Sequence, residues 1–131
     1  MRILGIDYGI KRIGVALSDT EAKFGQPYVV VKNTKTALAR IASIADQENV
    51  SEIILGESKD FKGQENVVMV KMHVFKNELE TLTGKTVIFE PEFLTSHQAQ
   101  YFQGKHDLLD ASAAALILQS YLDRKNNQGN K

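Results

Sequence analysis

The 131-residue sequence contains no cysteine and no tryptophan, and it has only two prolines. Without cysteine the chain can form neither a disulfide framework nor a thiolate metal site, and this composition fits a reducing compartment such as the cytoplasm. No apolar run approaches the ~20 residues that span a bilayer, so we expect no membrane segment. The amino terminus leads directly into an apolar strand, and we therefore expect no signal peptide.

The chain also lacks net charge, because 16 basic residues balance 16 acidic ones. A strong non-specific nucleic-acid binder usually has a basic excess, so that class is disfavoured, although a local basic patch is compatible with the composition. Apolar residues make up 43% and charged residues 24%, as in an ordinary globular domain. We expect one domain over residues 1–124 and a disordered polar tail over residues 125–131.

Hydrophobic periodicity predicts an α/β fold with a mixed five-stranded sheet. The first two apolar runs are joined by a short turn and should pair as a hairpin. Three antiparallel strands should therefore precede two parallel strands, with helices packed on the sheet. The expected strands span residues 2–7, 12–18, 27–31, 52–56 and 86–90. The expected helices span about 34–48, 64–82, 95–103 and 108–123, the first of them capped by Asn33 or Thr34.

Asp7 is the most informative single residue. It follows the apolar residues 3–6 and precedes Tyr8 and Gly9. A carboxylate at the end of a buried strand is costly unless something compensates its charge, and the nearby glycine allows a ligand to approach the backbone. The alternative is an Asx-turn, in which Asp7 stabilises the tight turn and nothing more.

Other acidic residues stand in similar places. Asp110 lies at the head of an alanine-rich helix; if Asp107 caps this helix, Asp110 falls on the stripe that the helix buries, and otherwise Asp110 is itself the cap. Glu90 and Glu92 follow the last apolar strand, where either is a metal ligand or a solvated acid at the strand end. Carboxylates that converge at the ends of core elements indicate a hard-cation site and hence phosphoryl chemistry.

Basic residues near these acids are candidates for contacts with a phosphate backbone, although exposed lysines are more often solvated charge. The three histidines have no metal-ligand spacing among themselves, so we expect no zinc site. The candidate nucleic-acid-binding residues are Lys11 and Arg12 in the first hairpin, and Lys59 and Lys62 in the loop before the long helix.

Four segments together resemble the YqgF (RuvX) family over roughly residues 1–123. These segments are residues 5–16, residues 63–65 (Gly63-Gln64-Glu65), residues 94–96 (Leu94-Thr95-Ser96) and residues 110–121, which begin Asp110-Ala111-Ser112. Members of this family are RNase H-like proteins. They are described as candidate Holliday junction resolvases and as candidate nucleases that trim the 5′ end of pre-16S ribosomal RNA.

The resemblance implies a phosphodiesterase whose acidic triad is Asp7, Glu92 and Asp110. Glu92 is preferred to Glu90 because it keeps the family's spacing to residues 94–96. The triad would hold Mg²⁺ or Mn²⁺ for two-metal-ion hydrolysis that leaves a 5′ phosphate. The implied substrate is structured RNA such as pre-16S rRNA, in ribosome biogenesis. The alternative substrate is a branched four-way DNA junction, whose resolution needs two active sites and therefore a homodimer.

The sequence departs from the family pattern at residues that would contact a substrate. Phe93 stands where the family usually has arginine, and residues 103–106 are less basic than usual. The loop at residues 57–60 reads Glu-Ser-Lys-Asp, where the family usually has an apolar residue followed by proline. These changes favour a second alternative, a non-catalytic nucleic-acid-binding ribosome-assembly factor on the same fold. The start of the chain also resembles the phosphate loop of actin-like ATPases and sugar kinases, but those folds need two lobes.

Overall fold

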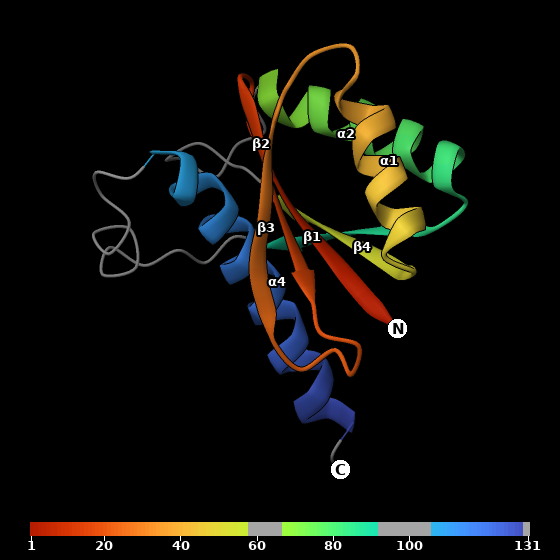
Figure 1. The fold of residues 1–131 in the computed structure, drawn as a ribbon, viewed down its shortest axis with the longest axis vertical. Coiled ribbons are helices and arrows are strands. Elements are labelled where there is room, and N and C mark those ends of the chain that lie inside the picture. Colours follow the sequence, from red (N-terminus) through yellow and green to blue (C-terminus); the bar gives the residue numbers. More distant parts are fainter. Residues whose placement is uncertain (58–66, 92–105, 130–131) are drawn as a thin grey trace.

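The computed structural model describes residues 1–57, 67–91 and 106–129. Every strand expected from the apolar runs is present, and each begins and ends within two residues of its predicted position. The predicted helix over residues 95–103 lies outside the described residues. In chain order the elements are β1 (Arg2–Tyr8), β2 (Arg12–Ser18), β3 (Gly25–Lys32), α1 (Ala37–Gln47), β4 (Val50–Glu57), α2 (Val67–Thr83), β5 (Thr86–Pro91) and α4 (His106–Gly129) (Figure 1).

The strands form one five-stranded mixed sheet in the order β3-β2-β1-β4-β5. β1 pairs antiparallel with β2, and β2 pairs antiparallel with β3. β4 pairs parallel with both β1 and β5, because α1 and α2 carry the chain back to the same end of the sheet each time. This topology confirms the sheet predicted from the sequence, with β1 at its centre.

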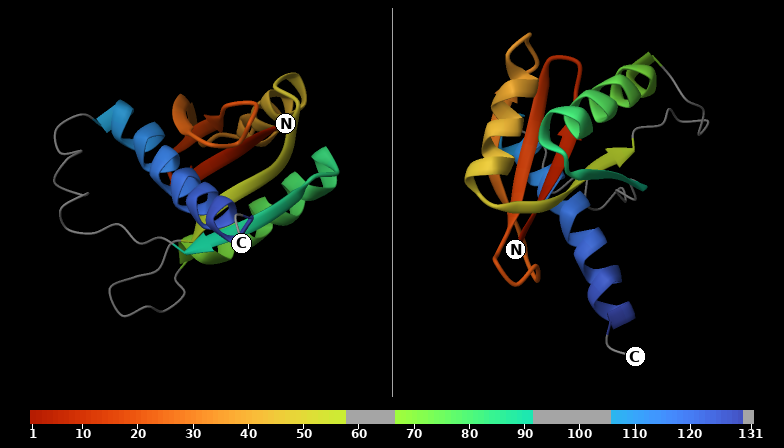
Figure 2. Two further views of the ribbon diagram at one scale, coloured as in Figure 1. Left: turned by 90° about the horizontal axis from the view of Figure 1, so that it is seen from below. Right: turned by 90° about the vertical axis from the view of Figure 1, so that its right-hand side faces the viewer.

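Alternate residues of β1 face two separate hydrophobic clusters. Leu4 and Ile6 are fully buried among the apolar side chains of α1 and α2. Ile3 precedes Leu4 in the strand, so its side chain points to the opposite face and packs in the cluster that α4 forms there. Figure 2 shows this arrangement, with α4 on one side of the sheet and the two shorter helices on the other. The sheet is therefore the middle layer of three.

α4 packs directly on the backbone of β1 at Gly5. A Cβ atom at Gly5 would lie 2.8 Å from Leu118 Cβ and 3.1 Å from the carbonyl oxygen of Ala114. These separations leave no room for a side chain, so the absence of one at Gly5 sets how close α4 comes to the sheet.

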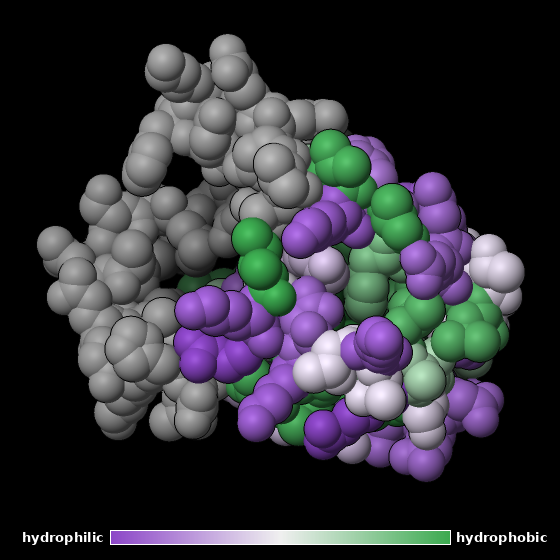
Figure 3. Space-filling model, turned by 90° about the horizontal axis from the view of Figure 1, so that it is seen from above, coloured by the Kyte–Doolittle hydropathy of each residue, from purple (hydrophilic) through white to green (hydrophobic). Residues whose placement is uncertain are grey.

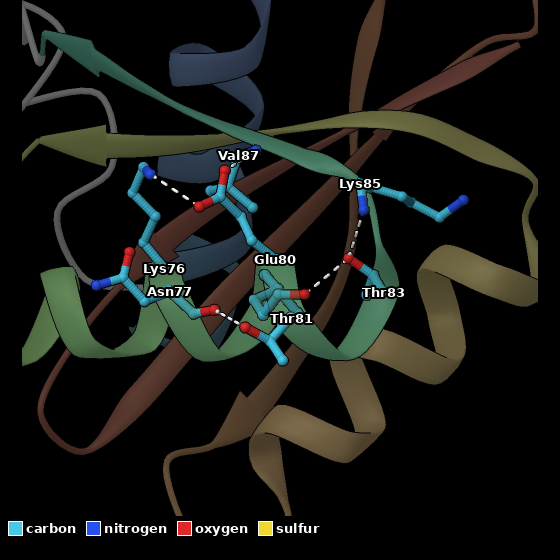
Figure 4. A network of polar contacts seen from close by, with 8 residues as sticks. Lys76, Asn77, Glu80, Thr81, Thr83, Lys85 and Val87 are labelled. Carbon is cyan, nitrogen blue, oxygen red and sulfur yellow. Dashed lines mark hydrogen bonds and ion pairs between the residues drawn. The ribbon is translucent and has the colours of Figure 1, made fainter.

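The end of α2 is tied to the start of β5 through Glu80 (Figure 4). One carboxylate oxygen accepts a hydrogen bond from the Val87 backbone N–H at 3.1 Å, and the other pairs with Lys76 Nζ at 3.0 Å. These two partners lower the pKa of Glu80 below its ordinary value. Gly84, with φ of +71°, ends the helix as a glycine cap.

The boundaries of α1 and α4 differ from the prediction. The N-cap of α1 is Thr36, not Asn33 or Thr34. The Asn33 side chain donates to the carbonyl oxygen of Gly9 at 2.8 Å and Thr34 Oγ1 accepts from the Thr36 backbone N–H at 3.4 Å, so both side chains serve the turn before the helix. α4 continues to Gly129, through residues that their composition predicts to be a disordered tail. None of the helices in the described part of the chain is long and apolar enough to cross a membrane.

Candidate active site

Asp7 is the last residue but one of β1 and lies directly opposite Gly14 of β2. It therefore belongs to the ladder of the sheet, and the turn begins after Tyr8. Its half-buried side chain lies on the face covered by α4, because Gly5, two residues earlier in the strand, meets Leu118 of that helix. The sequence thus places a carboxylate at the rim of the sheet, beneath a helix.

Asp110 lies in the second turn of α4, whose backbone runs antiparallel to β1. Ile117 lies against Gly56 near the end of β4, whereas Tyr121 contacts Glu52 near its start, and β4 runs parallel to β1. Since moving toward the start of α4 moves toward the end of β1, the backbone of Asp110 lies toward the end of the sheet that holds Asp7. Asp110 is not the first residue of the helix, which begins at His106.

Glu90, the unchosen member of the Glu90 and Glu92 pair, has no exposed surface. One of its carboxylate oxygens pairs with Arg124 of α4, and the other accepts a hydrogen bond from Ser120 Oγ at 3.3 Å. Both oxygens therefore have partners within the protein. The sequence analysis did not predict the pair of Glu90 with Arg124. The available signal was the carboxylate at the end of an apolar strand, because a buried carboxylate requires a partner.

A second polar cluster ties α4 to the start of β4. The Tyr121 hydroxyl donates to Glu52 at 2.8 Å, and Lys125 Nζ pairs with the same carboxylate oxygen at 3.0 Å. Burial, followed by the hydrogen bond to Glu52 and the negative charge of that group, raises the pKa of Tyr121 to about 12. Because Glu52 stands near the beginning of β4, this cluster lies at the end of the sheet opposite to Asp7.

Three further residues of the predicted site, Glu92, Lys59 and Lys62, lie outside the described residues. Among the side chains that the structure describes, no group of three histidine or acidic residues stands close enough together to hold a metal ion. The predicted ligands nevertheless share one kind of donor, the carboxylate oxygen, which suits Mg²⁺ and Mn²⁺. Of the predicted ligands Asp7, Glu92 and Asp110, Asp7 is the one for which the structure gives both the position in a strand and the burial of the side chain.

Lys11 and Arg12 are exposed in and beside the turn that joins β1 to β2. This hairpin is fastened to the end of β3, because the Asn33 backbone N–H donates to the carbonyl oxygen of Lys11 at 2.9 Å and its side chain donates to Gly9. Figure 3 views the molecule from this end, where hydrophilic side chains gather beside the grey segments. The structure therefore brings two of the predicted basic residues to the same end of the sheet as Asp7.

The chain is similar to proteins of one family along most of its length. The family described as "RuvX: Holliday junction resolvase" matches residues 1–124. A protein of Syntrophus aciditrophicus named "Putative pre-16S rRNA nuclease" is 37% identical over 133 residues, which cover 94% of this chain and 89% of the relative. A protein of Endomicrobium trichonymphae with the same name is 34% identical, with coverage of 97% and 99%.

Solved structures show the same fold at low sequence identity. RuvC of Thermus thermophilus superposes with a TM-score of 0.63 and 16% identity, over 96% of this chain and 97% of that one. The fowlpox virus resolvase, solved with Holliday junction DNA, gives a TM-score of 0.60 and 16% identity, over 95% and 98% of the two chains. These similarities confirm the RNase H-like fold. The family match over residues 1–124 and the relatives at 37% and 34% identity show that the protein belongs to the RuvX (YqgF) family.

Proposed function

We propose that this protein is a metal-dependent nuclease that processes the 5′ end of pre-16S rRNA. The observation that carries the proposal is the position of Asp7. Its half-buried carboxylate lies near the end of the central strand, at the same end of the sheet as the first turns of α4. Relatives at 37% and 34% identity that are named as pre-16S rRNA nucleases support the choice of substrate.

The ions would be held by Asp7, Asp110 and Glu92. Glu92 is preferred to Glu90 because both carboxylate oxygens of Glu90 already have partners in α4. When bound, Mg²⁺ or Mn²⁺ supplies a Lewis acid that activates water and neutralises charge on the phosphate. Oxygen donors alone meet the preference of these cations.

The protein's own contribution is to fix the positions of the acidic residues. Asp7 lies on a central strand that is hydrogen-bonded on both sides, and the contact of Gly5 with Leu118 fixes the separation of β1 from α4. Catalytic groups held on strands and helices are more precisely placed than those on loops. Lys11 and Arg12 would hold substrate phosphates next to these groups.

The test is a Mg²⁺ and Mn²⁺ titration of cleavage on an RNA that contains the 5′ precursor region of 16S rRNA. Asp7→Asn and Asp110→Asn should each abolish cleavage and leave the circular dichroism spectrum unchanged. Asp46→Asn serves as the matched control, because Asp46 is exposed on α1, across the sheet from α4. Full activity in Asp7→Asn would refute the assignment.

Junction resolution is the second candidate, favoured by the family description as a Holliday junction resolvase. The same titration on a four-way DNA junction distinguishes the two functions. Paired symmetric nicks, together with a dimeric mass in solution, would indicate resolution. Tight binding of RNA without metal, and no cleavage of either substrate with metal, would indicate an assembly factor.

A further inference from the structure

A groove of about 520 Å³ separates β3 from the first half of α4 on the face of the sheet that holds Asp7. Its walls include Ala111 of α4 and Val30 of β3, and two cations, Arg12 and Lys32, also line it. Sites for small organic ligands typically measure about 300–1,000 Å³. The groove is therefore large enough for a nucleotide or for part of a single extended strand.

The two cations of the groove face one another across neighbouring strands. Arg12 of β2 and Lys32 of β3 are direct cross-strand partners, and both are exposed. Residues directly opposite in an antiparallel pair have Cβ atoms about 5 Å apart, so a single phosphate can contact both side chains. This geometry gives the pair a binding role.

The register of the sheet relates this pair to Asp7. Asp7, Gly14 and Val30 form one row across β1, β2 and β3, and Arg12 with Lys32 forms the next row on the same face. Two residues along a strand correspond to about 7 Å. Since neighbouring strands lie about 4.8 Å apart, Arg12 is one strand and Lys32 two strands away from Asp7. A nucleic-acid strand that leaves Asp7 along the groove would therefore pass Arg12 first and Lys32 next.

We propose that this groove binds the sugar–phosphate backbone of a single nucleic-acid strand and leads it to Asp7, with Arg12 and Lys32 as its cationic contacts. The proposal rests on the proposed nuclease function and extends it with Lys32, which no sequence pattern indicates. Contacts of this kind position a strand without reading its bases, so binding should depend on salt and not on sequence.

The test measures binding of a single-stranded RNA oligonucleotide by fluorescence anisotropy in EDTA, over a range of salt concentrations. Lys32→Gln should weaken binding and reduce the slope of log K against log[salt] by about 0.7, the value for one cation on a single strand. Lys85→Gln is the matched control, because Lys85 precedes β5 at the opposite end of the sheet. It should leave affinity and slope unchanged. Lys32→Gln should also unfold at the same temperature as the native protein, since Lys32 is exposed.

An unchanged affinity and slope in Lys32→Gln, or equal losses in Lys85→Gln, would overturn the groove proposal. Binding in EDTA separates this result from catalysis. If Lys32→Gln loses affinity while the native protein cleaves nothing with metal, the groove is supported and the nuclease function fails. If the native protein cleaves RNA and Lys32→Gln matches it in binding and in KM, the nuclease stands and the groove fails. Stronger competition by an acidic peptide than by RNA would assign the groove to a protein partner and overturn the proposal.

Discussion

Glu90 of β5 and Arg124 of α4 form an ion pair in which the carboxylate is 0% exposed and the arginine side chain is 51% exposed. Removal of the arginine alone would leave a buried carboxylate without its counter-charge. We expect Arg124→Ala to lower the free energy of unfolding by about 3 kcal/mol, the low end for a broken buried pair because the guanidinium is partly solvated. Urea denaturation measures this loss.

The adjacent ion pair provides the control. Lys125 pairs with Glu52, but its side chain is 53% exposed and that of Glu52 is 18% exposed. Lys125→Ala should therefore cost less than about 1 kcal/mol. The double change Glu90→Met with Arg124→Met should recover most of the loss, since apolar groups of similar size need no counter-charge. Equal losses in Arg124→Ala and Lys125→Ala would contradict this account.

These ion pairs also explain where sequence reasoning failed at the end of α4. Residues after Asp123 are polar and read as a tail, yet the helix continues to Gly129. Arg124 and Lys125 are held by partners more than 30 positions away, on β5 and β4. A local sequence pattern cannot indicate such distant partners, so a prediction from composition ends α4 too early.

The strands and the position of Asp7 near the end of β1 could be predicted because their signals are local. A run of apolar residues that ends at one acid marks a buried strand and its end. Asn33 instead binds Gly9 and does not cap α1, and Lys32 lies directly opposite Arg12 in the sheet. Both relationships arise from the sheet, which brings together residues that are distant in the sequence.

Two glycines that face α4 should differ in their tolerance of alanine. At Gly5 the new Cβ would lie 2.8 Å from Leu118 Cβ and 3.1 Å from the backbone of Ala114, neither of which can move without shifting the helix. At Gly56 it would meet Ile117 Cδ1 at 2.4 Å, the end of a flexible side chain. We expect Gly5→Ala to cost about 3 kcal/mol and Gly56→Ala about 1 kcal/mol, by thermal or urea unfolding. The reverse order would contradict the close packing of α4 on β1.

Alkaline pH should destabilise the protein through Tyr121. Burial and Glu52 raise its pKa from 10.0 to about 12 in the folded protein. The unfolded chain therefore loses this proton first, so stability is complete below pH 10 and falls as the pH rises toward 12. Absorbance at 295 nm should show one tyrosine that ionises late, absent in Tyr121→Phe, and the variant should lose less stability over this interval. Identical alkaline profiles for the two proteins would refute the assignment.

Acid should destabilise the junction of α2 and β5 through Glu80. Its hydrogen bond from Val87 and its pair with Lys76 lower its pKa below 4.5 in the folded state. The stabilisation is therefore complete above pH 4.5 and is lost as the pH falls through the folded value. Glu80→Gln should reduce stability at neutral pH by less than about 1 kcal/mol and flatten the acid branch of the profile. Glu78→Gln, at an exposed position on α2, should leave that branch unchanged.

Divalent metal should stabilise the fold if Asp7 is a ligand. A ligand that binds the folded state alone stabilises it by RT ln(1 + [L]/Kd), which is about 2.7 kcal/mol at 100 times Kd. Mg²⁺ or Mn²⁺ should therefore raise the melting temperature of the native protein in a concentration-dependent way. Asp7→Asn should lose this rise, while Asp46→Asn, exposed on α1, should retain it. Because the readout is thermal and needs no substrate, it tests the metal site separately from cleavage. An equal rise in Asp7→Asn would remove Asp7 from the metal site whatever the outcome of the nuclease assay.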